Sequence, residues 1–501
     1  MRSKFAISLV IALAPPLPAL AQDSAPTLDQ IAPDIDALFA AYQADAHVPG
    51  LVYGIVKDGE LVHMKTLGVQ DLGTGRPVTP DTRFRIASMT KAFTALAILQ
   101  LRDEGRLGLD DPAEKYVPEM QGWTYPTADS PRIRVRDLLH HVGGLVTDDP
   151  WGDRQQMLPH DDFAKMIAAG VPFSRVPQSQ HEYSNFGYAL LGRIAAAASG
   201  MPYNDYVQSR ILTPLGMTAT GFEVGAVPRD RLAIGYRWEN ERWSVEPEMR
   251  DGAFGAMGGL VTTAGDYAKW VAFLLAAWPP RDDADTGPVK RATVREIAQG
   301  LNFTSVAGRI GSSGQAACKQ SLAYGMGWRV AQDCDLGLTL AHGGGYPGYG
   351  SHVMLMPDRG TGVFALANRT YAGPSAPAWD AAVAMEKAGL LPPRPVPVSP
   401  AIADAFAATR AAYAAGTLAP LDGRLAMNFL LDRSAENWAA ELAKLKDQVG
   451  ECPAAQPLAP LGALSTAFRL DCERGKLDGL LLLAPTTPAT VQALRLRVAA
   501  P

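Results

Sequence analysis

The stretch FRIASMTKAFTALAILQL, residues 84–101, decides the fold of this chain. Ser88 stands three residues before Lys91, and side chains at that spacing share one face of a helix, so the lysine amine can reach the serine hydroxyl. The ten residues after Lys91 are helix-forming and largely apolar, which predicts a central, buried helix. Ser88 then lies at the helix N-terminus, where backbone N–H groups stabilise negative charge. We interpret Ser88 as a nucleophile activated by Lys91.

A second candidate element, Tyr183-Ser184-Asn185, lies about 95 residues further along the chain. In an extended loop, side chains two residues apart project the same way. The Tyr183 phenol can then shuttle a proton if nearby cations lower its pKa. The Asn185 amide can hold a substrate amide and Lys91 together. A Tyr-x-Asn sequence alone is usually structural, so a functional role for it depends on the other candidate elements of the chain.

The third element is His342 followed by three glycines, at the end of an expected strand. Without side chains, Gly344 and Gly345 let a substrate backbone lie against that strand. The N–H of Gly345 can act as a second oxyanion donor beside that of Ser88. His342 is expected to supply a proton donor or a positive charge. The other reading is a flexible turn beside an ordinary histidine.

These three elements, in this order, resemble the serine β-lactamase and penicillin-binding protein superfamily. The similarity covers roughly residues 30–385 and is closest to the branch of class C β-lactamases, D-alanyl-D-alanine carboxypeptidases and family VIII esterases. Tyr183-Ser184-Asn185 matches the form of this motif in the carboxypeptidases, and His342 occupies the position where most lactamases have lysine. Both departures favour a peptidase or esterase over an efficient lactamase. Further matching segments are residues 105–112, 133–145 and 258–266.

The resemblance implies a serine hydrolase that forms an acyl-enzyme on an amide or ester, with no metal or organic cofactor. The favoured activity is that of a D-alanyl-D-alanine carboxypeptidase, a D-aminopeptidase or a β-lactamase-related enzyme. A family VIII-type carboxylesterase is the first alternative. A catalytically weak protein that binds β-lactams or wall fragments is the second. Ser88, Lys91 and Tyr183 are the expected catalytic residues, and the expected substrate-binding residues are Asn185, His342, Gly344 and Gly345.

The strand pattern predicts a mixed α/β (α+β) fold. Residues 51–57 and 60–67 flank Asp58-Gly59, a hairpin signal, and strand character returns after residue 320. The region between, about 88–270, is expected to be mostly helical. We therefore expect an antiparallel five-stranded sheet flanked by helices, with an inserted helical subdomain. The late strands are expected at 324–331, 336–341, 349–356 and 361–367, the second being least certain because Gly337 weakens it.

Five prolines in residues 391–400 predict a stiff linker and a domain boundary. The expected parts are a signal peptide (1–21), a hydrolase domain (22–390), the linker and a small α+β accessory domain (401–501). In the last part, a helix starting at Asp432 or Ser434 and ending at Gly450 should precede strands near 464–471, 477–484 and 491–498. This part holds no histidine, which favours a binding or stabilising role.

The N-terminus and the charge balance indicate an exported, soluble protein. Arg2 and Lys4 precede a short apolar stretch, and Ala19-Leu20-Ala21 is a typical cleavage pattern. We therefore expect a periplasmic or secreted protein whose mature chain has no membrane span. A net charge of −5 without a long basic run argues against nucleic acid as a partner. The expected partner is a small-molecule or peptide substrate: an acyl-D-Ala-type peptide, a β-lactam or an ester.

The four cysteines fall into two close pairs. In an exported protein this spacing suggests two local disulfides, Cys318–Cys334 and Cys452–Cys472. Four free thiols remain the alternative. Zinc is disfavoured, because its ligands are usually closer together and include histidine.

Overall fold

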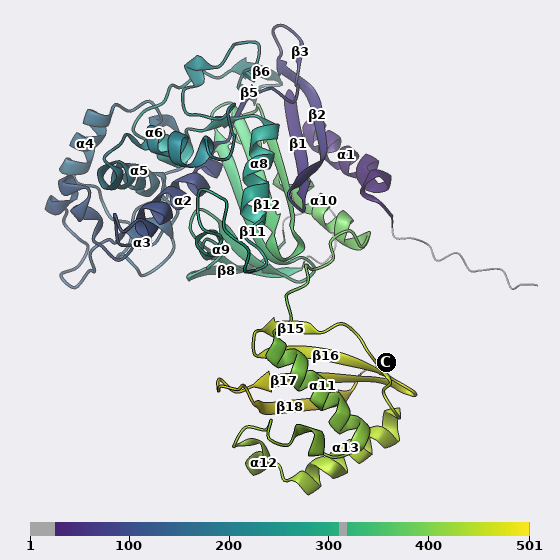
Figure 1. Ribbon diagram of the computed structural model, residues 1–501. Coiled ribbons are helices and arrows are strands. Elements are labelled where there is room, and N and C mark those ends of the chain that lie inside the picture. Colours follow the sequence, from purple (N-terminus) through teal and green to yellow (C-terminus); the bar gives the residue numbers. More distant parts are fainter. Residues whose placement is uncertain (1–25, 310–317, 500–501) are drawn as a thin grey trace, which may run out of the picture.

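The computed structural model describes residues 26–309 and 318–499, so the expected signal peptide lies outside the described residues. Its larger part is built on an antiparallel sheet in the order β3-β2-β1-β13-β12-β11-β10-β9-β8 (Figure 1). Strands from both ends of this part meet in the sheet, because β1 pairs with β13. The strands are β1 (Gly50–Lys57), β2 (Glu60–Asp71), β3 (Arg76–Pro77), β8 (Asn302–Gly308), β9 (Lys319–Tyr324), β10 (Arg329–Asp333), β11 (Gly337–Tyr346), β12 (Tyr349–Met356) and β13 (Thr361–Ala367).

The expected fold class is confirmed, but five strands were too few, since the sheet has nine within the described residues. The segment expected as one strand, 324–331, contains a reversal between β9 and β10, with Gly327 in the left-handed region at φ +77°. β8 was not among the expected strands. It is an exposed edge strand, so it lacks the alternation of buried and exposed residues that would have predicted it.

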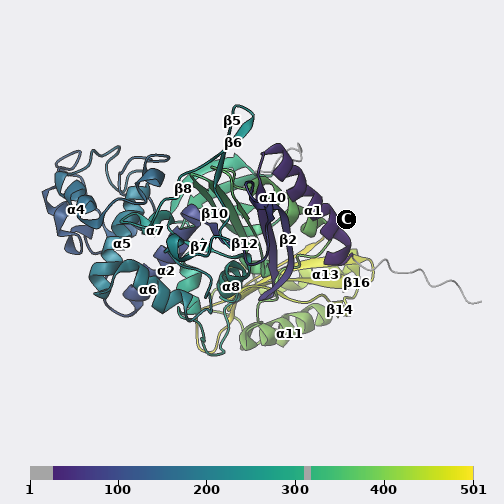
Figure 2. The ribbon, with the colours of Figure 1, turned by 90° about the horizontal axis from the view of Figure 1, so that it is seen from above.

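Helices cover both faces of the sheet. α1 (Leu28–Asp45) and α10 (Ser375–Lys387) pack together on one face, and α8 (Ala264–Leu275) lies against β1 and β13 on the other. Figure 2 shows the inserted, mostly helical region beside the sheet, away from α1 and α10. Its helices are α2 (Thr90–Asp103), α3 (Val135–Leu139), α4 (His160–Ala169), α5 (Asn185–Ser199), α6 (Tyr203–Val207) and α7 (Gly255–Gly258), with α9 (Arg291–Glu296) following later.

Two short strand pairs connect these layers. β4 (Phe84–Arg85) pairs with β7 (Val261–Thr262) immediately before the Ser88 segment. β5 (Tyr236–Glu239) and β6 (Arg242–Val245) form a separate hairpin. The β4–β7 pair holds the chain in place directly before Ser88 and the start of α2.

The helix α2 is central, as its composition predicts. Its residues from Thr90 to Leu101 are all buried, polar side chains included. Phe93 stacks on Trp270 of α8, with ring centroids 3.7 Å apart. The helix therefore holds its N-terminal end, where Ser88 lies, between the sheet and the helical region.

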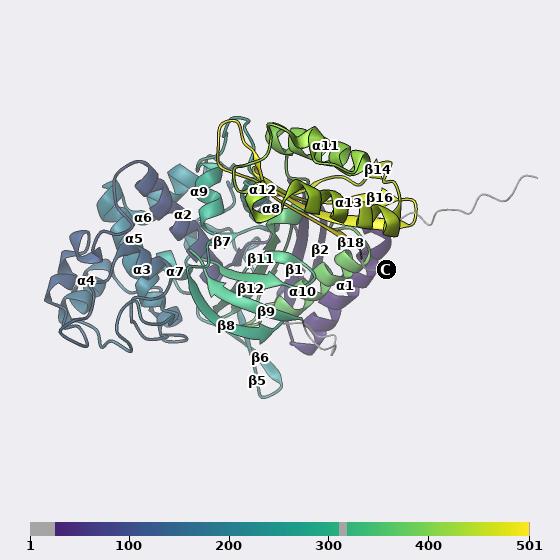
Figure 3. The same cartoon turned by 90° about the horizontal axis from the view of Figure 1, so that it is seen from below.

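The C-terminal part has a hydrophobic core of its own, built from residues after position 400. Helices α11 (Pro400–Ala415) and α13 (Ala435–Val449) cover one face of a five-stranded sheet (Figure 3). Ser434 caps α13 by accepting a hydrogen bond from the Asn437 N–H, and Gly450 follows its last residue, as expected. The remaining elements are α12 (Phe429–Asp432), β14 (Ala454–Ala455), β15 (Ala459–Gly462), β16 (Ser465–Cys472), β17 (Gly475–Leu483) and β18 (Val491–Val498).

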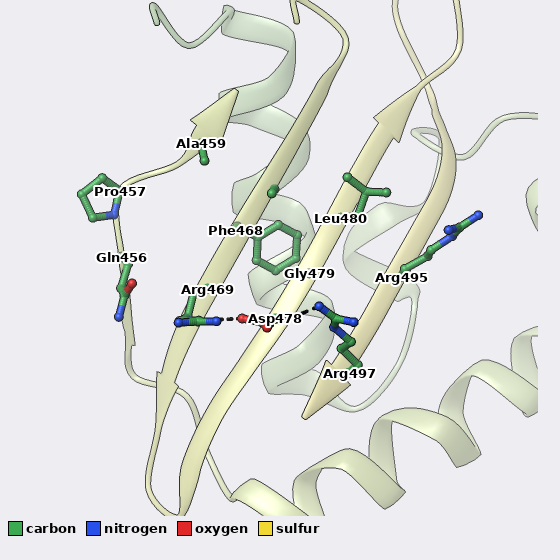
Figure 4. Close-up of a pocket in the computed structure, with 11 residues that line it drawn as sticks. Gln456, Pro457, Ala459, Phe468, Arg469, Asp478, Gly479, Leu480, Arg495 and Arg497 are labelled. Carbon is green, nitrogen blue, oxygen red and sulfur yellow. Dashed lines mark hydrogen bonds and ion pairs between the residues drawn. The ribbon is translucent and has the colours of Figure 1, made fainter. Parts of the chain in front are cut away.

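The opposite face of this small sheet is not covered by α11 or α13. It carries a row of charged residues, Arg469, Asp478 and Arg497, on three neighbouring strands (Figure 4). The Arg469 Nε donates to Asp478 Oδ1 at 2.6 Å, and Arg497 lies 3.9 Å from the other carboxylate oxygen. A shallow hollow of about 540 Å³ lies over this row.

Both expected disulfides are present, Cys318–Cys334 and Cys452–Cys472. The first joins the segment before β9 to the end of β10, and the second lies within the C-terminal part. Among the described residues, no helix combines the length and the apolar character that crossing a membrane requires.

The stacking of Phe93 on Trp270 predicts a large effect on stability. Phe93→Ala should lower the free energy of unfolding by about 3–5 kcal/mol, because it empties a fully buried site. Val306→Ala is the control: its side chain is 61% exposed, so the change should stay within about 0.5 kcal/mol. Urea unfolding followed by tryptophan fluorescence measures both. Equal midpoints for the two variants would contradict the central role of α2.

Candidate active site

Ser88 lies at the entrance to α2, in a single 3₁₀ turn formed by Ala87–Met89. The preceding residue, Ala87, has φ +49°, a left-handed conformation that non-glycine residues rarely adopt. Strained backbone of this kind is often found at functional sites. The Ser88 side chain lines a cavity although the residue is only 7% exposed.

Lys91 is fully buried, and its amine is fixed by three hydrogen bonds. Its Nζ donates to Ser88 Oγ at 2.9 Å, to Asn185 Oδ1 at 2.7 Å and to the Met257 carbonyl at 2.8 Å. These acceptors come from three different segments of the chain. The first bond is the contact that the Ser-x-x-Lys spacing predicts.

Burial lowers the pKa of Lys91 to about 8, because the charged ammonium loses its hydration. The carboxylates of Asp149, Asp153 and Asp148 oppose this change but do not cancel it. A substantial fraction of Lys91 is therefore neutral in mildly alkaline solution. A neutral amine 2.9 Å from a hydroxyl is able to take its proton.

Tyr183 lies beside this pair, with its ring centroid 4.9 Å from Lys91 Nζ. Burial, together with the neighbouring Tyr324 and Asp149, raises the pKa of its phenol well above 10. The condition set out from the sequence, that nearby cations lower this pKa, is therefore not met, and Tyr183 is protonated at neutral pH. The neighbouring loop is held by His141, whose Nδ1 accepts the Ser184 N–H at 3.1 Å.

Asn185 is the first residue of α5, so Tyr183-Ser184-Asn185 is a helix start rather than an extended loop throughout. Asp148 caps this helix by accepting the N–H groups of Asn185 at 2.6 Å and Phe186 at 2.8 Å. The Asn185 side chain joins two charges: its oxygen accepts from Lys91, and its amide donates to Asp149 Oδ1. One amide is thereby held between an amine and a carboxylate.

His342 lies in β11 and is buried. Its Nδ1 is 2.7 Å from the Gly343 carbonyl, which can only accept, so the ring proton is on Nδ1. Its Nε2 then accepts from the Tyr324 hydroxyl at 3.0 Å. Burial and the nearby Lys91 lower the pKa of His342 to about 3. His342 is therefore neutral with both ring nitrogens occupied, which disagrees with the expected positive charge.

The glycines after His342 lie within β11, rather than after a strand. β10 pairs with β11 only as far as Ala341, so among the described strands the edge of the next residues is open on that side. A Cβ on Gly344 would lie 2.2 Å from the Ile86 carbonyl oxygen, and one on Gly345 would lie 2.7 Å from the Tyr371 ring. Only glycine allows β11 to approach the Ser88 segment this closely.

A cavity of about 620 Å³ joins these elements. Five of the seven expected site residues line it, and Lys91 and Asn185 lie behind its wall: the lining five are Ser88, Tyr183, His342, Gly344 and Gly345. β8 also borders the cavity, through Ala307 and Gly308.

Sequence reasoning missed several polar residues of the cavity. Asp149 and Asp153 belong to the loop before α4, and Arg329 begins β10. The Tyr371 hydroxyl donates to Asp153 Oδ2 at 3.1 Å across 218 positions of sequence. No local motif marks a contact of that span. The only available signal was the polar run after Leu145, which contains three aspartates.

The close approach at Gly344 gives a test of the site. Gly344→Ala should slow acylation by roughly 100-fold, because the methyl group must push β11 away from Ser88. Gly343→Ala is the matched control, since a Cβ there meets its nearest atom at 3.8 Å. The rate of labelling by a fluorophosphonate probe measures both. Equal slowing in the two variants would show that β11 does not set the geometry around Ser88.

Comparisons with known proteins agree with this geometry. The family model described as Beta-lactamase matches residues 35–386. Beta-lactamase-like protein 2 of Dictyostelium discoideum is 34% identical over 284 residues, which cover 54% of this chain and 50% of that protein. Protein flp of Staphylococcus aureus (strain MRSA252) is 30% identical over 343 residues, which cover 67% of this chain and 62% of that protein. The matches thus span about half to three-fifths of these relatives.

A solved structure, that of the octameric penicillin-binding protein homologue from Pyrococcus abyssi, shares the fold. The two superpose with a TM-score of 0.60 at 21% identity, covering 93% of this chain and 99% of that one. Family match and fold agree with the resemblance drawn from Ser88, Tyr183 and His342. The chain therefore belongs to the serine β-lactamase and penicillin-binding protein superfamily, which comprises serine hydrolases.

Proposed function

We propose that this protein is an exported hydrolase that cleaves amides of the D-aminoacyl type through an acyl-enzyme on Ser88. The observation that carries the proposal is the 2.9 Å hydrogen bond between Lys91 and Ser88 inside a substrate-sized cavity. A buried amine with a pKa of about 8 at this distance activates a hydroxyl at near-neutral pH. Carboxypeptidase, D-aminopeptidase and β-lactamase-related activities all use this chemistry.

In the acylation step, the Ser88 oxygen bonds to the substrate carbonyl carbon while neutral Lys91 takes the hydroxyl proton. The tetrahedral oxyanion accepts hydrogen bonds from the N–H groups of Ser88 and Gly345, each contributing roughly 3 kcal/mol. The C–N bond then breaks, and the leaving nitrogen receives a proton from Tyr183, which regains one from Lys91. Because the phenol is protonated at rest, Tyr183 acts as a relay and Lys91 as the base.

Water completes the cycle by attacking the acyl-enzyme carbonyl. Its proton passes to the Lys91–Tyr183 pair, the Ser88 oxygen leaves with a proton, and a carboxylic acid is released. Asn185 keeps Lys91 in place through its 2.7 Å hydrogen bond. His342 supports this arrangement as a neutral group, in contact with Tyr324.

Arg329 supports a peptide substrate with a terminal carboxylate. It lines the cavity and forms no ion pair among the described residues, so its guanidinium is available to a ligand. His352, nearby in the same cavity, has an Nε2 without a hydrogen-bond partner in the described part of the chain. These two groups suit an anionic group of the substrate.

A carboxylesterase remains the second candidate, favoured by the apolar wall that Leu322, Ala331 and Trp379 contribute. The two disulfides suit an exported protein. Turnover of a nitrocephalosporin, a D-Ala-D-Ala peptide and a p-nitrophenyl ester, compared side by side, separates lactamase, peptidase and esterase. Stable acylation without turnover would instead indicate a binding protein.

Ser88→Ala should reduce fluorophosphonate labelling by at least about 10⁴-fold, because the nucleophile is removed. Ser375→Ala is the matched control: this serine lines the same cavity but lies at the start of α10. It should keep wild-type labelling. Labelling of Ser88→Ala at the wild-type rate would overturn the proposed mechanism.

The pKa of Lys91 sets the expected pH dependence. Lys91 must be neutral to accept the Ser88 proton, so the acylation rate should rise about tenfold per pH unit below pH 8 and level off above it. An uncharged p-nitrophenyl ester is the substrate of choice, because its own charge does not change with pH. Stopped-flow measurement of the acylation burst from pH 6 to 9.5 gives the profile. A rate that falls over this range would contradict Lys91 as the base.

A further inference from the structure

Part of the wall of the cavity is acidic. Asp149 and Asp153 both line it, beside Ser88 and Gly345. Neither carboxylate forms an ion pair with Lys, Arg or His among the described residues, although both act on the charge of Lys91. The catalytic cavity therefore contains two carboxylates without a cationic partner of their own.

Asp153 is the more unusual of the two. It is only 2% exposed, and its single hydrogen bond is the one that its Oδ2 accepts from Tyr371. Its Oδ1 has no partner in the described parts of the chain. Burying a carboxylate in this way costs several kcal/mol unless a cation compensates it. Burial accordingly raises the pKa of Asp153 to about 7, and the nearby Asp149 adds to the effect.

Asp149 changes what Asn185 can offer to a substrate. The Asn185 amide could donate to the carbonyl of an acylated substrate, as the sequence suggested. In the structure that amide donates to Asp149. A substrate group placed here meets a carboxylate as well as an amide, so a hydrogen-bond donor with positive charge fits better than a carbonyl oxygen.

The contacts of the two carboxylates indicate which part of the substrate meets this wall. Asp149 accepts a hydrogen bond from Asn185, the residue expected to hold the amide of the substrate. Asp153 accepts one from Tyr371, whose ring lies against Gly345, the proposed oxyanion donor. We therefore assign the acidic wall to the acyl side of the scissile bond.

From this arrangement we propose that Asp149 and Asp153 bind a free ammonium group on the acyl part of the substrate. The enzyme then prefers amides of amino acids with an unblocked α-amine over N-acylated substrates, which makes it an aminopeptidase-type hydrolase. Tyr371 is the positioning residue, since it holds Asp153 and packs against Gly345, an oxyanion donor. This inference rests on the proposed acyl-enzyme chemistry of Ser88.

The test compares two substrates that differ only at the amine: D-alanine p-nitroanilide and its N-acetyl derivative. For the wild-type enzyme, kcat/KM should be at least about 30-fold higher for the free amine, as expected for a cation paired with a desolvated carboxylate. Asp149→Asn and Asp153→Asn should each lower this ratio about tenfold or more, mainly through loss of rate on the free amine. Each variant keeps the size of the side chain.

Asp161→Asn is the control for net charge, because Asp161 is an exposed residue of α4 outside the cavity lining. It should keep the wild-type ratio. Fluorophosphonate labelling, which needs no amine, shows in parallel whether each variant retains its acylation machinery.

The possible results separate the two proposals. Absent labelling and absent hydrolysis in the wild type would refute the acyl-enzyme chemistry, and the amine preference with it. Normal labelling with equal or faster hydrolysis of the acetylated substrate would refute the amine preference alone. A preference that persists in both Asp→Asn variants, with labelling intact, would also overturn the assignment to Asp149 and Asp153.

Discussion

The buried amine of Lys91 is the interaction on which the site depends. Three acceptors surround it, from Ser88, Asn185 and the Met257 carbonyl. Burying an ammonium group costs free energy unless such partners are present, so the three segments that provide them must keep their relative positions. The same burial that requires these hydrogen bonds also lowers the pKa of the amine, so stability and reactivity have one cause.

Charge is distributed unequally around this amine. Carboxylates from the loop before α4 act on its charge, whereas the nearby His342 is neutral and accepts a hydrogen bond from Tyr324. These carboxylates oppose the effect of burial on Lys91, since nearby negative charge favours the ammonium. A cationic ligand beside them would offset this negative charge and favour the neutral amine. Substrate binding and base activation would then be coupled through the same carboxylates.

Local sequence patterns predicted the contacts and helices that depend on residues close together in the chain. The spacing of Ser88 and Lys91 predicts their contact, and the apolar run after Lys91 predicts a buried helix, which is α2. The number of strands in the sheet was underestimated for two reasons. β8 has no buried face, and the reversal at Gly327 lies inside an apparently continuous strand. Asp153 could not be identified either, because its partner Tyr371 comes from a distant segment.

The pairing of β1 with β13 also has a consequence for how the chain is made. Leu51 pairs with Ala367, so the middle of the sheet cannot form until almost the whole larger part has been synthesised. At typical ribosomal speeds the interval is roughly 15–60 s, during which β1 lacks its neighbour β13. Contacts between such distant residues also slow folding, because a long loop must close first. The delay would suit the proposed export, because a chain that has not yet folded is the form that can be translocated.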